Sequence, residues 1–259
     1  MLLETMTMPE KVLDKTKLVN VIILLYKNPN FMGFSKSFDI EICGKPMRSY
    51  VELAVNAYPT KTTVCTLGTN IFSLIRPMLT DSKLTLVLYS DTPLISSQTI
   101  EEIVDYALKN QITCQKLPRG FVFDTEYVLN AESLASEQTV YFGDEDFVEV
   151  FDLKQLEFVS SIQKTRILEK HQKSGVLIQD NLTTFIDFDA EIESGVVIEP
   201  MCVIKGQTKI GKNAVVKSGS HLENAVIGEG AVIEKSFVKN AEVKPFTHTK
   251  PFEIIEEEK

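Results

Sequence analysis

Residues 186–222 read IDFDAEIESGVVIEPMCVIKGQTKIGKNAVVKSGSHL, and an aliphatic residue returns at every sixth position of this stretch. A repeat of six with one apolar side chain per unit indicates a triangular parallel β-helix, in which each unit is one short strand and one corner. An ordinary β-sandwich is the alternative, but chance spacing does not keep one register over so many units. The repeated positions are Ile186, Ile192, Ile198, Ile204, Ile210, Val216 and Leu222 and, after a slip of register, Ile227, Ile233, Val238 and Val243.

The segment before the repeat is predicted to be a connecting helix. Residues 152–155, DLKQ, have the form of a capping box, in which Asp152 accepts free backbone amides and Gln155 reaches back to the cap. Apolar residues then recur at helical spacing, and Gly175 supplies a stop. We therefore expect a helix over 152–173 within a connecting segment 152–175, and a β-helix domain over 176–259.

Strands and helices alternate over residues 1–151. Continuous apolar runs at 19–25 and 84–89 predict buried strands, and helical spacing follows around 100–108. This alternation implies an α/β domain with a mostly parallel sheet. Ligands of such sheets bind beyond the carboxyl ends of the strands, so the loop 26–38 and the segment 90–94 are the expected site positions.

Composition excludes several classes of protein. The 259 residues carry 27 basic and 36 acidic side chains, a net charge of −9, which argues against binding to nucleic acid or to a membrane surface. No apolar run approaches the roughly 18 residues of a membrane span, and no signal peptide is visible, so a cytoplasmic location is expected. Four widely separated cysteines indicate neither a zinc site nor a disulfide framework, and buried thiols are expected.

Four segments, in order, resemble one family. They are ICGKPMRSYV at 42–51, TLGTN at 66–70, LVLYSDTPLI at 86–95 and the connecting helix leading into the repeat. They are similar to the bifunctional N-acetylglucosamine-1-phosphate uridyltransferase and glucosamine-1-phosphate acetyltransferase of bacterial cell-wall precursor synthesis. The resemblance implies a Rossmann-like nucleotidyltransferase α/β domain, shortened here, a short left-handed β-helix of hexapeptide repeats, and a homotrimer.

The resemblance also implies site residues. Asp91 matches the aspartate that holds magnesium in the family, although Ser90 replaces the preceding glycine. Magnesium is therefore the one candidate cofactor. The residues at 67–70 match the family's segment near the uracil and are the candidate contacts to a uridine nucleotide or sugar nucleotide; they are Leu67, Gly68, Thr69 and Asn70.

The departures from the family lie mainly in the loop 26–38. Tyr26 and Asn28 stand at two glycines of the phosphate-binding loop, Asn30 at its arginine, and Ser37 at its lysine, with Lys36 adjacent as the one candidate catalytic residue. The second magnesium ligand falls at Phe151, next to Asp152. No match is found for the family's sugar-binding segments between Asp91 and the connecting helix. Several groups needed for nucleotidyl transfer are thus replaced.

The carboxyl-terminal stretch VKPFTHTKPF at 243–252 resembles a family segment that precedes the acetyltransferase residues. That activity is therefore not expected. His171 and His221 are predicted to be surface side chains, and His248, with no acid foreseen beside it, is given no catalytic role.

Each candidate residue has a structural alternative. Asp91 is either a magnesium ligand or the cap of a turn fixed by Pro93. Lys27, Lys36 and Lys45 either form a shared positive mouth for phosphate or are solvated. Residues 67–70 either touch a base or form a strand-to-helix turn.

Two hypotheses follow. In the first, the protein is an active sugar-1-phosphate nucleotidyltransferase with an altered nucleotide loop. In the second, it is a catalytically impaired relative that acts as a binding, assembly or regulatory subunit, with a complete paralogue as a candidate partner. The loop 26–38 discriminates between them and favours the second, because anion-binding loops use glycine to turn consecutive amides toward the ligand.

Overall fold

The computed structural model describes residues 14–31, 33–34, 36–132, 134, 138–143 and 145–257. It divides into two compact units, each treated separately below. The sheet unit comprises Met1–Tyr26, Val51–Ser90 and Ile95–Phe147. The β-helix unit comprises Lys27–Tyr50, Asp91–Leu94 and Val148–Lys259, so that it includes two segments from the first half of the sequence. Within the described ranges, no helix is both long and apolar enough to cross a membrane.

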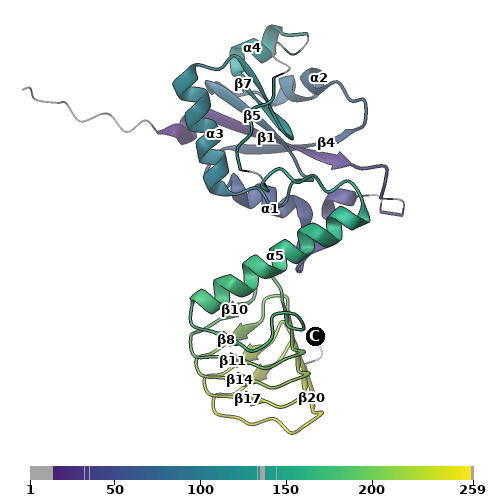
Figure 1. The fold of residues 1–259 in the computed structure, drawn as a ribbon, viewed down its shortest axis with the longest axis vertical. Coiled ribbons are helices and arrows are strands. Elements are labelled where there is room, and N and C mark those ends of the chain that lie inside the picture. Colours follow the sequence, from purple (N-terminus) through teal and green to yellow (C-terminus); the bar gives the residue numbers. More distant parts are fainter. Residues whose placement is uncertain are drawn as a thin grey trace, which may run out of the picture. The chain divides into compact units, whose positions relative to one another are not determined.

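The sheet unit is built on five strands in the order β4-β1-β5-β7-β6 (Figure 1). β1 and β5 pair in parallel, as expected, but β7 is antiparallel to both β5 and β6. The prediction of a mostly parallel sheet was therefore wrong for this edge, because only two residues join β6 to β7 and so short a connection permits only a hairpin. The strands are β1 (Val19–Lys27), β4 (Thr60–Thr66), β5 (Leu84–Tyr89), β6 (Cys114–Leu117) and β7 (Gly120–Asp124).

Both faces of this sheet are covered by helices (Figure 1). Alternate residues of β1 point to opposite sides: Val21 and Ile23 join the cluster that contains α1 and α3 side chains, whereas Ile22 and Leu24 join the cluster with α2 and α4. Burial on both faces explains the continuous apolar run in the sequence. The helices are α1 (Met47–Ala54), α2 (Ile71–Ile75), α3 (Ser97–Asn110) and α4 (Thr125–Asn130), with short 3₁₀ turns at Lys15–Lys17 and Arg76–Met78.

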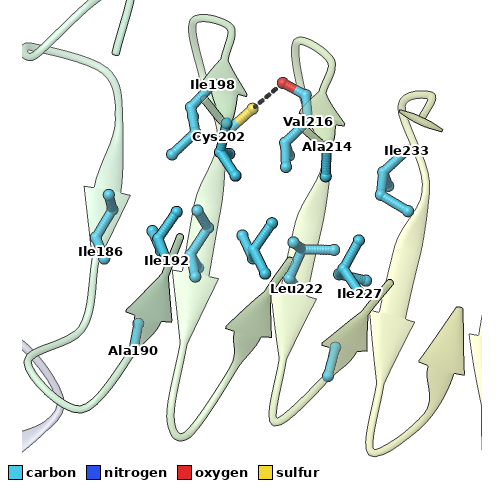
Figure 2. Packing of buried hydrophobic residues seen from close by; sticks show 14 of the residues in the cluster. Ile186, Ala190, Ile192, Ile198, Cys202, Ala214, Val216, Leu222, Ile227 and Ile233 are labelled. Carbon is cyan, nitrogen blue, oxygen red and sulfur yellow. Dashed lines mark hydrogen bonds between the residues drawn. The ribbon is translucent and has the colours of Figure 1, made fainter. Parts of the chain in front are cut away.

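The second unit contains the β-helix predicted from the repeat of six. Short strands stack in parallel into three sheets, ordered β8-β11-β14-β17, β9-β12-β15-β18-β20 and β10-β13-β16-β19 (Figure 1). The predicted aliphatic positions are all buried, and Figure 2 shows such side chains from successive coils meeting in the interior. The predicted fold class, an α/β domain followed by a β-helix of hexapeptide repeats, is therefore confirmed.

The strands of the β-helix are two or three residues long. They are β8 (Leu177–Ile178), β9 (Phe185–Ile186), β10 (Glu191–Ile192), β11 (Val197–Ile198), β12 (Val203–Lys205), β13 (Lys209–Ile210), β14 (Val215–Val216), β15 (His221–Glu223), β16 (Val226–Ile227), β17 (Val232–Ile233), β18 (Phe237–Lys239), β19 (Glu242–Val243) and β20 (Ile254–Glu256).

Each corner of the β-helix buries a small residue beside the aliphatic one. Wide side chains do not fit there, because the two walls of the triangle converge. The buried corner residues include Cys202, Thr208, Ala214, Ser220, Ala225, Ala231, Ser236 and Ala241.

Left-handed backbone recurs at the corners of the β-helix, and one column of corners shows how it is accommodated. Gly206, Asn224 and Asn240 have φ of 63°, 47° and 47°. Asn224 Oδ1 accepts a hydrogen bond from Gln207 N at 3.1 Å, and its amide contacts Asn240 Oδ1 at 3.4 Å. Asparagine tolerates this conformation better than other non-glycine residues, and a Cβ on Gly206 would collide with the Asn224 side chain.

The connecting helix is α5 (Leu153–Lys173), with Asp152 as its N-cap accepting from Gln155 N at 2.8 Å. The return bond of the predicted capping box is missing, since Gln155 Oε1 is buried without a hydrogen-bond partner in the described chain. Ile167 and Leu168 of α5 pack into the β-helix core. Leu156 and Val159 pack with a cluster that includes the hairpin of β2 (Glu41–Ile42) and β3 (Lys45–Pro46), and Ser37–Asp39 forms a 3₁₀ turn.

Two neighbouring substitutions test the packing of the repeat. Ile210, 1% exposed, fills the interior, whereas Lys209 points outward from the same strand. Ile210→Ala is expected to lower the free energy of unfolding by about 2–5 kcal/mol, because it removes buried methyl groups and leaves a cavity. Lys209→Ala is expected to change it by less than about 1 kcal/mol. Urea unfolding followed by circular dichroism measures both, and equal effects would contradict the assignment of inward and outward positions.

Candidate functional site

The sheet unit contains a pocket of about 130 Å³ where β1, β4 and β5 end. Two tyrosines and one arginine form its walls, and the turn after β4 forms its rim. The pocket therefore combines aromatic faces with a positive charge and nearby backbone groups. Its lining residues are Tyr26, Cys65, Thr66, Leu67, Gly68, Thr69, Ile71, Tyr89 and Arg119.

Arg119 is the residue of this pocket that sequence reasoning missed. Its guanidinium carbon lies 4.0 Å from the centre of the Tyr89 ring and 5.0 Å from that of Tyr26. The two rings meet edge to face with centroids 6.2 Å apart. Cation–π contacts of this kind hold an arginine side chain in place. In the sequence, the one indication of a role for Arg119 was its position in the two-residue turn between β6 and β7.

The structure brings three of the four predicted nucleotide contacts to this pocket. Leu67, Gly68 and Thr69 line it, with Leu67 77% exposed. Thr69 Oγ1 accepts from Thr66 N at 3.1 Å and fixes the turn, and Gly68 adopts φ +80°. Asn70 is not among the lining residues. Its side chain caps α2 by accepting from Ser73 N at 3.2 Å, which is the structural alternative considered for this residue.

The loop around residues 28–31, which the sequence motifs align with a phosphate-binding loop, is tied together by its own side chains. Asn28 N donates to Ser37 Oγ at 2.9 Å, and Asn30 N donates to Asn28 Oδ1 at 2.9 Å. Phe31 N donates to the Asn28 carbonyl at 3.3 Å, and Pro29 has no amide hydrogen. From residue 28 to residue 31, every amide donor therefore has a partner inside the loop.

The same loop is fastened to the chain just before α5. Asn28 Nδ2 donates to the carbonyl of Phe151 at 3.0 Å and more weakly to that of Val150 at 3.4 Å. Asn30 Nδ2 also donates to the Phe151 carbonyl, at 3.2 Å. The position that aligns with the family's second magnesium ligand thus offers its backbone oxygen to the loop. Its neighbour Asp152 serves as the helix cap.

Asp91, the predicted magnesium ligand, is buried with 1% of its surface exposed, in the β-helix unit. Its carbonyl accepts from Val150 N at 2.8 Å. Within the described residues, no three His, Cys, Asp or Glu side chains gather into a group able to hold a metal ion. Asp91 stays a predicted ligand on the strength of the resemblance.

The three lysines weighed as a positive mouth for phosphate, Lys27, Lys36 and Lys45, have different surroundings. Lys45 is paired with Asp189 at 3.0 Å and lies 4.9 Å from the centre of the Phe188 ring. Lys36 borders an open hollow of about 460 Å³ that it shares with the carboxylates of Asp39 and Glu41, and such a setting does not favour an anion. Lys27 is exposed.

Two of the three histidines differ from expectation. His171 is buried, not on the surface, and burial lowers its pKa, with a further effect of the Lys170 charge. His248 has an acid beside it after all, since its Nε2 lies 2.7 Å from Glu234 Oε2. His221 is half-buried against Phe237, and burial again lowers its pKa. The helical periodicity of the sequence could not predict that His171 is buried, because it does not show what packs against the end of α5.

None of the four cysteines, all of which lie in the described chain, forms a disulfide. Cys65, Cys114 and Cys202 are buried and Cys43 is half-buried. Burial raises the pKa of Cys43 and of Cys202 to about 11, so these thiols are protonated at neutral pH and poorly nucleophilic.

Comparison with known proteins supports the resemblance drawn from the motifs. Residues 189–224 match the bacterial transferase hexapeptide family (six repeats). The bifunctional protein GlmU of Streptococcus thermophilus is 34% identical over 119 residues, 44% of this chain and 26% of the relative. GlmU of Clostridium botulinum is 35% identical over 114 residues, 44% of this chain and 25% of the relative. The chain thus spans about a quarter of the length of the curated relatives it matches.

Among solved structures, molybdopterin-guanine dinucleotide biosynthesis protein A from Archaeoglobus fulgidus matches with a TM-score of 0.44 and 13% identity, covering 56% of this chain and 99% of that one. The CMP:2-keto-3-deoxy-manno-octonic acid synthetase complexed with CTP matches with a TM-score of 0.43 and 11% identity, covering 57% and 99%. Similarity at this level says nothing about activity. The chain is therefore similar to the bifunctional GlmU proteins over 44% of its own length, and it carries their type of hexapeptide repeat.

Proposed function

We propose that this chain is a nucleotide-sugar pyrophosphorylase relative that no longer performs nucleotidyl transfer and acts as a binding and assembly subunit. The observation that carries the proposal is the internal pairing of the loop amides at residues 28–31. A triphosphate is bound by backbone N–H groups that point at it and by cations placed against its charge. Amides that already donate within the loop do not serve this purpose unless the loop is rebuilt.

Loss of the cationic groups strengthens the proposal. The family's arginine and lysine positions are Asn30 and Ser37, and both side chains are engaged in the loop network. Removing one electrostatic partner of a developing charge typically costs on the order of 100-fold in rate. Two such losses together with an altered metal position are expected to leave little turnover, although their effects need not add.

The pocket of the sheet unit supports retained binding of a small planar group. Its volume of about 130 Å³ is well below the roughly 300–1,000 Å³ of sites that enclose whole ligands. A base ring lying against Tyr26 and Tyr89, with Arg119 and the turn at 67–69 as hydrogen-bonding groups, fits this size and chemistry. A uridine nucleotide or sugar nucleotide whose phosphates stay outside the pocket is the proposed ligand.

The outer faces of the β-helix support assembly into a homotrimer. The sheet of β10, β13, β16 and β19 presents mainly charged residues outward, among them Glu191, Lys209 and Glu242. The other two sheets present apolar columns. These are Leu177, Val197, Val215 and Val232 on one and Phe185, Val203, His221, Phe237 and Ile254 on the other, His221 being the one polar member.

Two different apolar faces per chain suit a ring closed by a threefold axis, in which one face of each copy meets the other face of the next. The charged face then remains in solvent. A complete paralogue that presents the same repeat is a second proposed partner, since it could replace one copy in such a ring.

The activity test is pyrophosphate release from uridine triphosphate and N-acetylglucosamine-1-phosphate with magnesium. We expect turnover to be absent or reduced by at least about 100-fold from the roughly 1 per second at the low end of ordinary enzymes. Calorimetry with uridine monophosphate is expected to show binding that Arg119→Ala abolishes. Turnover near one per second that is lost in Asp91→Ala and kept in Asp81→Ala, an exposed control, would restore the enzyme hypothesis.

Asn28→Ala tests whether the loop is held by its own hydrogen bonds. The substitution leaves the Phe151 carbonyl and the Asn30 amide without their Asn28 partners, so we expect a loss of about 1–3 kcal/mol in the free energy of unfolding. The exposed Asn56→Ala serves as the matched control and is expected to stay within about 0.5 kcal/mol of the parent. A neutral Asn28→Ala in urea unfolding would mean that the loop is maintained by other contacts.

The same substitution on two faces tests the trimer. Val203→Glu places a charge in an apolar column, whereas Val226→Glu places it on the charged face. Light scattering at micromolar concentration is expected to give three times the chain mass for the parent and for Val226→Glu, and a smaller mass for Val203→Glu. A parent protein that is monomeric in this measurement would contradict the predicted homotrimer.

A further inference from the structure

A further hollow lies within the β-helix unit, along α5. It has a volume of about 210 Å³ and is lined by Gln163, Arg166, Ile167, Lys170 and Phe188. The first four residues are spaced by three, four and seven along the helix and therefore share one face. Neither the sequence motifs nor the resemblance gives these residues a role.

Hydrogen bonds hold this face of the helix in place. Gln163 is 5% exposed, and its Nε2 donates to the Pro93 carbonyl at 2.7 Å. Arg166 Nη1 donates to the Leu94 carbonyl at 2.9 Å. Ile167, also 5% exposed, forms an apolar floor. The cavity thus has a fixed, buried base and two cationic groups in its lining.

The charge at this cavity contrasts with that of the chain. The whole sequence has a net charge of −9, yet the cavity lining contains two cations and no carboxylate. On the same helix, Lys173 is paired with Glu169, whereas neither Arg166 nor Lys170 has an ion-pair partner among the described residues. Two cations four residues apart on a helix repel each other, and an anion between them would relieve that repulsion.

Phe188 adds an apolar wall. Its ring meets the Tyr50 ring edge to face with centroids 5.3 Å apart, and Lys170 Nζ lies 5.8 Å from the ring centre. Lys45 Nζ also lies 4.9 Å from the ring centre, so the ring has a defined orientation and contributes an apolar surface to the lining. A volume of about 210 Å³ is below the range typical of sites for whole nucleotides.

We propose that this cavity binds a small phosphate monoester, with the phosphate between Arg166 and Lys170 and its apolar group against Phe188 and Ile167. A phosphate monoester carries about −1.5 to −2 charge at pH 7, which matches two cations. The planar arginine fork is suited to two phosphate oxygens, and the ammonium group of lysine provides a point charge. The proposal does not depend on the proposed function, because it involves none of the loop or pocket residues.

The site is linked to Asp91 through the backbone. Both carbonyls that anchor the helix face belong to the short segment Asp91–Leu94. Arg166 therefore contacts both the proposed ligand site and the segment that contains Asp91.

Calorimetry of the full-length protein with phenyl phosphate tests the proposal, with inorganic phosphate, benzoate and benzyl alcohol as comparison probes. We expect phenyl phosphate to bind more tightly than each of the others, since only it offers both a dianion and a ring. Lys170→Gln and Arg166→Gln are each expected to weaken binding at least about tenfold, and Lys173→Gln, an exposed neighbour on α5, is expected to leave it unchanged. Added salt should weaken binding in the parent.

Circular dichroism spectra of the variants identify any loss of fold. If Arg166→Gln does not fold, the affinity of Lys170→Gln for phenyl phosphate tests the proposal instead. The Lys170 side chain makes no hydrogen bond in the described chain, so this variant is expected to fold. Absence of binding at 10-millimolar phenyl phosphate, or affinity that is equal in the parent and in Lys170→Gln, would overturn the proposal. Equal affinity for phenyl phosphate and inorganic phosphate would overturn the part assigned to Phe188.

Discussion

The narrow interior of the β-helix is the constraint on which its unit depends. Each side of a coil has room for one aliphatic side chain and one small corner residue, so the backbone turns after every five or six residues. This spacing aligns each strand with the strand one coil away and satisfies the backbone hydrogen bonds in parallel sheets. The alternation along each short strand also sets which positions face outward. One sheet carries an apolar outward column that includes Val203 and Phe237 and, beside it, a charged column of Lys205, Glu223 and Lys239.

A different principle governs the loop at 27–40. Here the chain uses polar side chains to satisfy the backbone, whereas a phosphate-binding loop leaves amides for its ligand. The Asn28 side chain donates a hydrogen bond to the Phe151 carbonyl and accepts one from the Asn30 amide. The Asn28 amide in turn donates to the hydroxyl of Ser37, nine residues farther along the chain. From residue 28 to residue 31, the amide donors are therefore satisfied within the loop.

The fold could be predicted from the sequence wherever a periodic pattern controls it. The spacing from Ile186 to Leu222 predicted the β-helix, and the apolar runs predicted β1 and β5. Features that depend on contacts between distant residues were not visible: Arg119 over two tyrosines, His248 beside Glu234, and the partner of Lys45. Three residues of the motif at 67–70 line the pocket, whereas Asn70 caps a helix, so a matched motif does not fix each side chain's role.

The mutual hydrogen bonds of Asn28, Asn30 and Ser37 make these three positions energetically interdependent. Replacing Ser37 by lysine alone would take away the acceptor of the Asn28 amide, and replacing Asn28 by glycine alone would take away the acceptor of the Asn30 amide. Each single change therefore removes a bond that supports the others. Substitutions at these positions should combine non-additively, and the loop behaves as one cooperative unit.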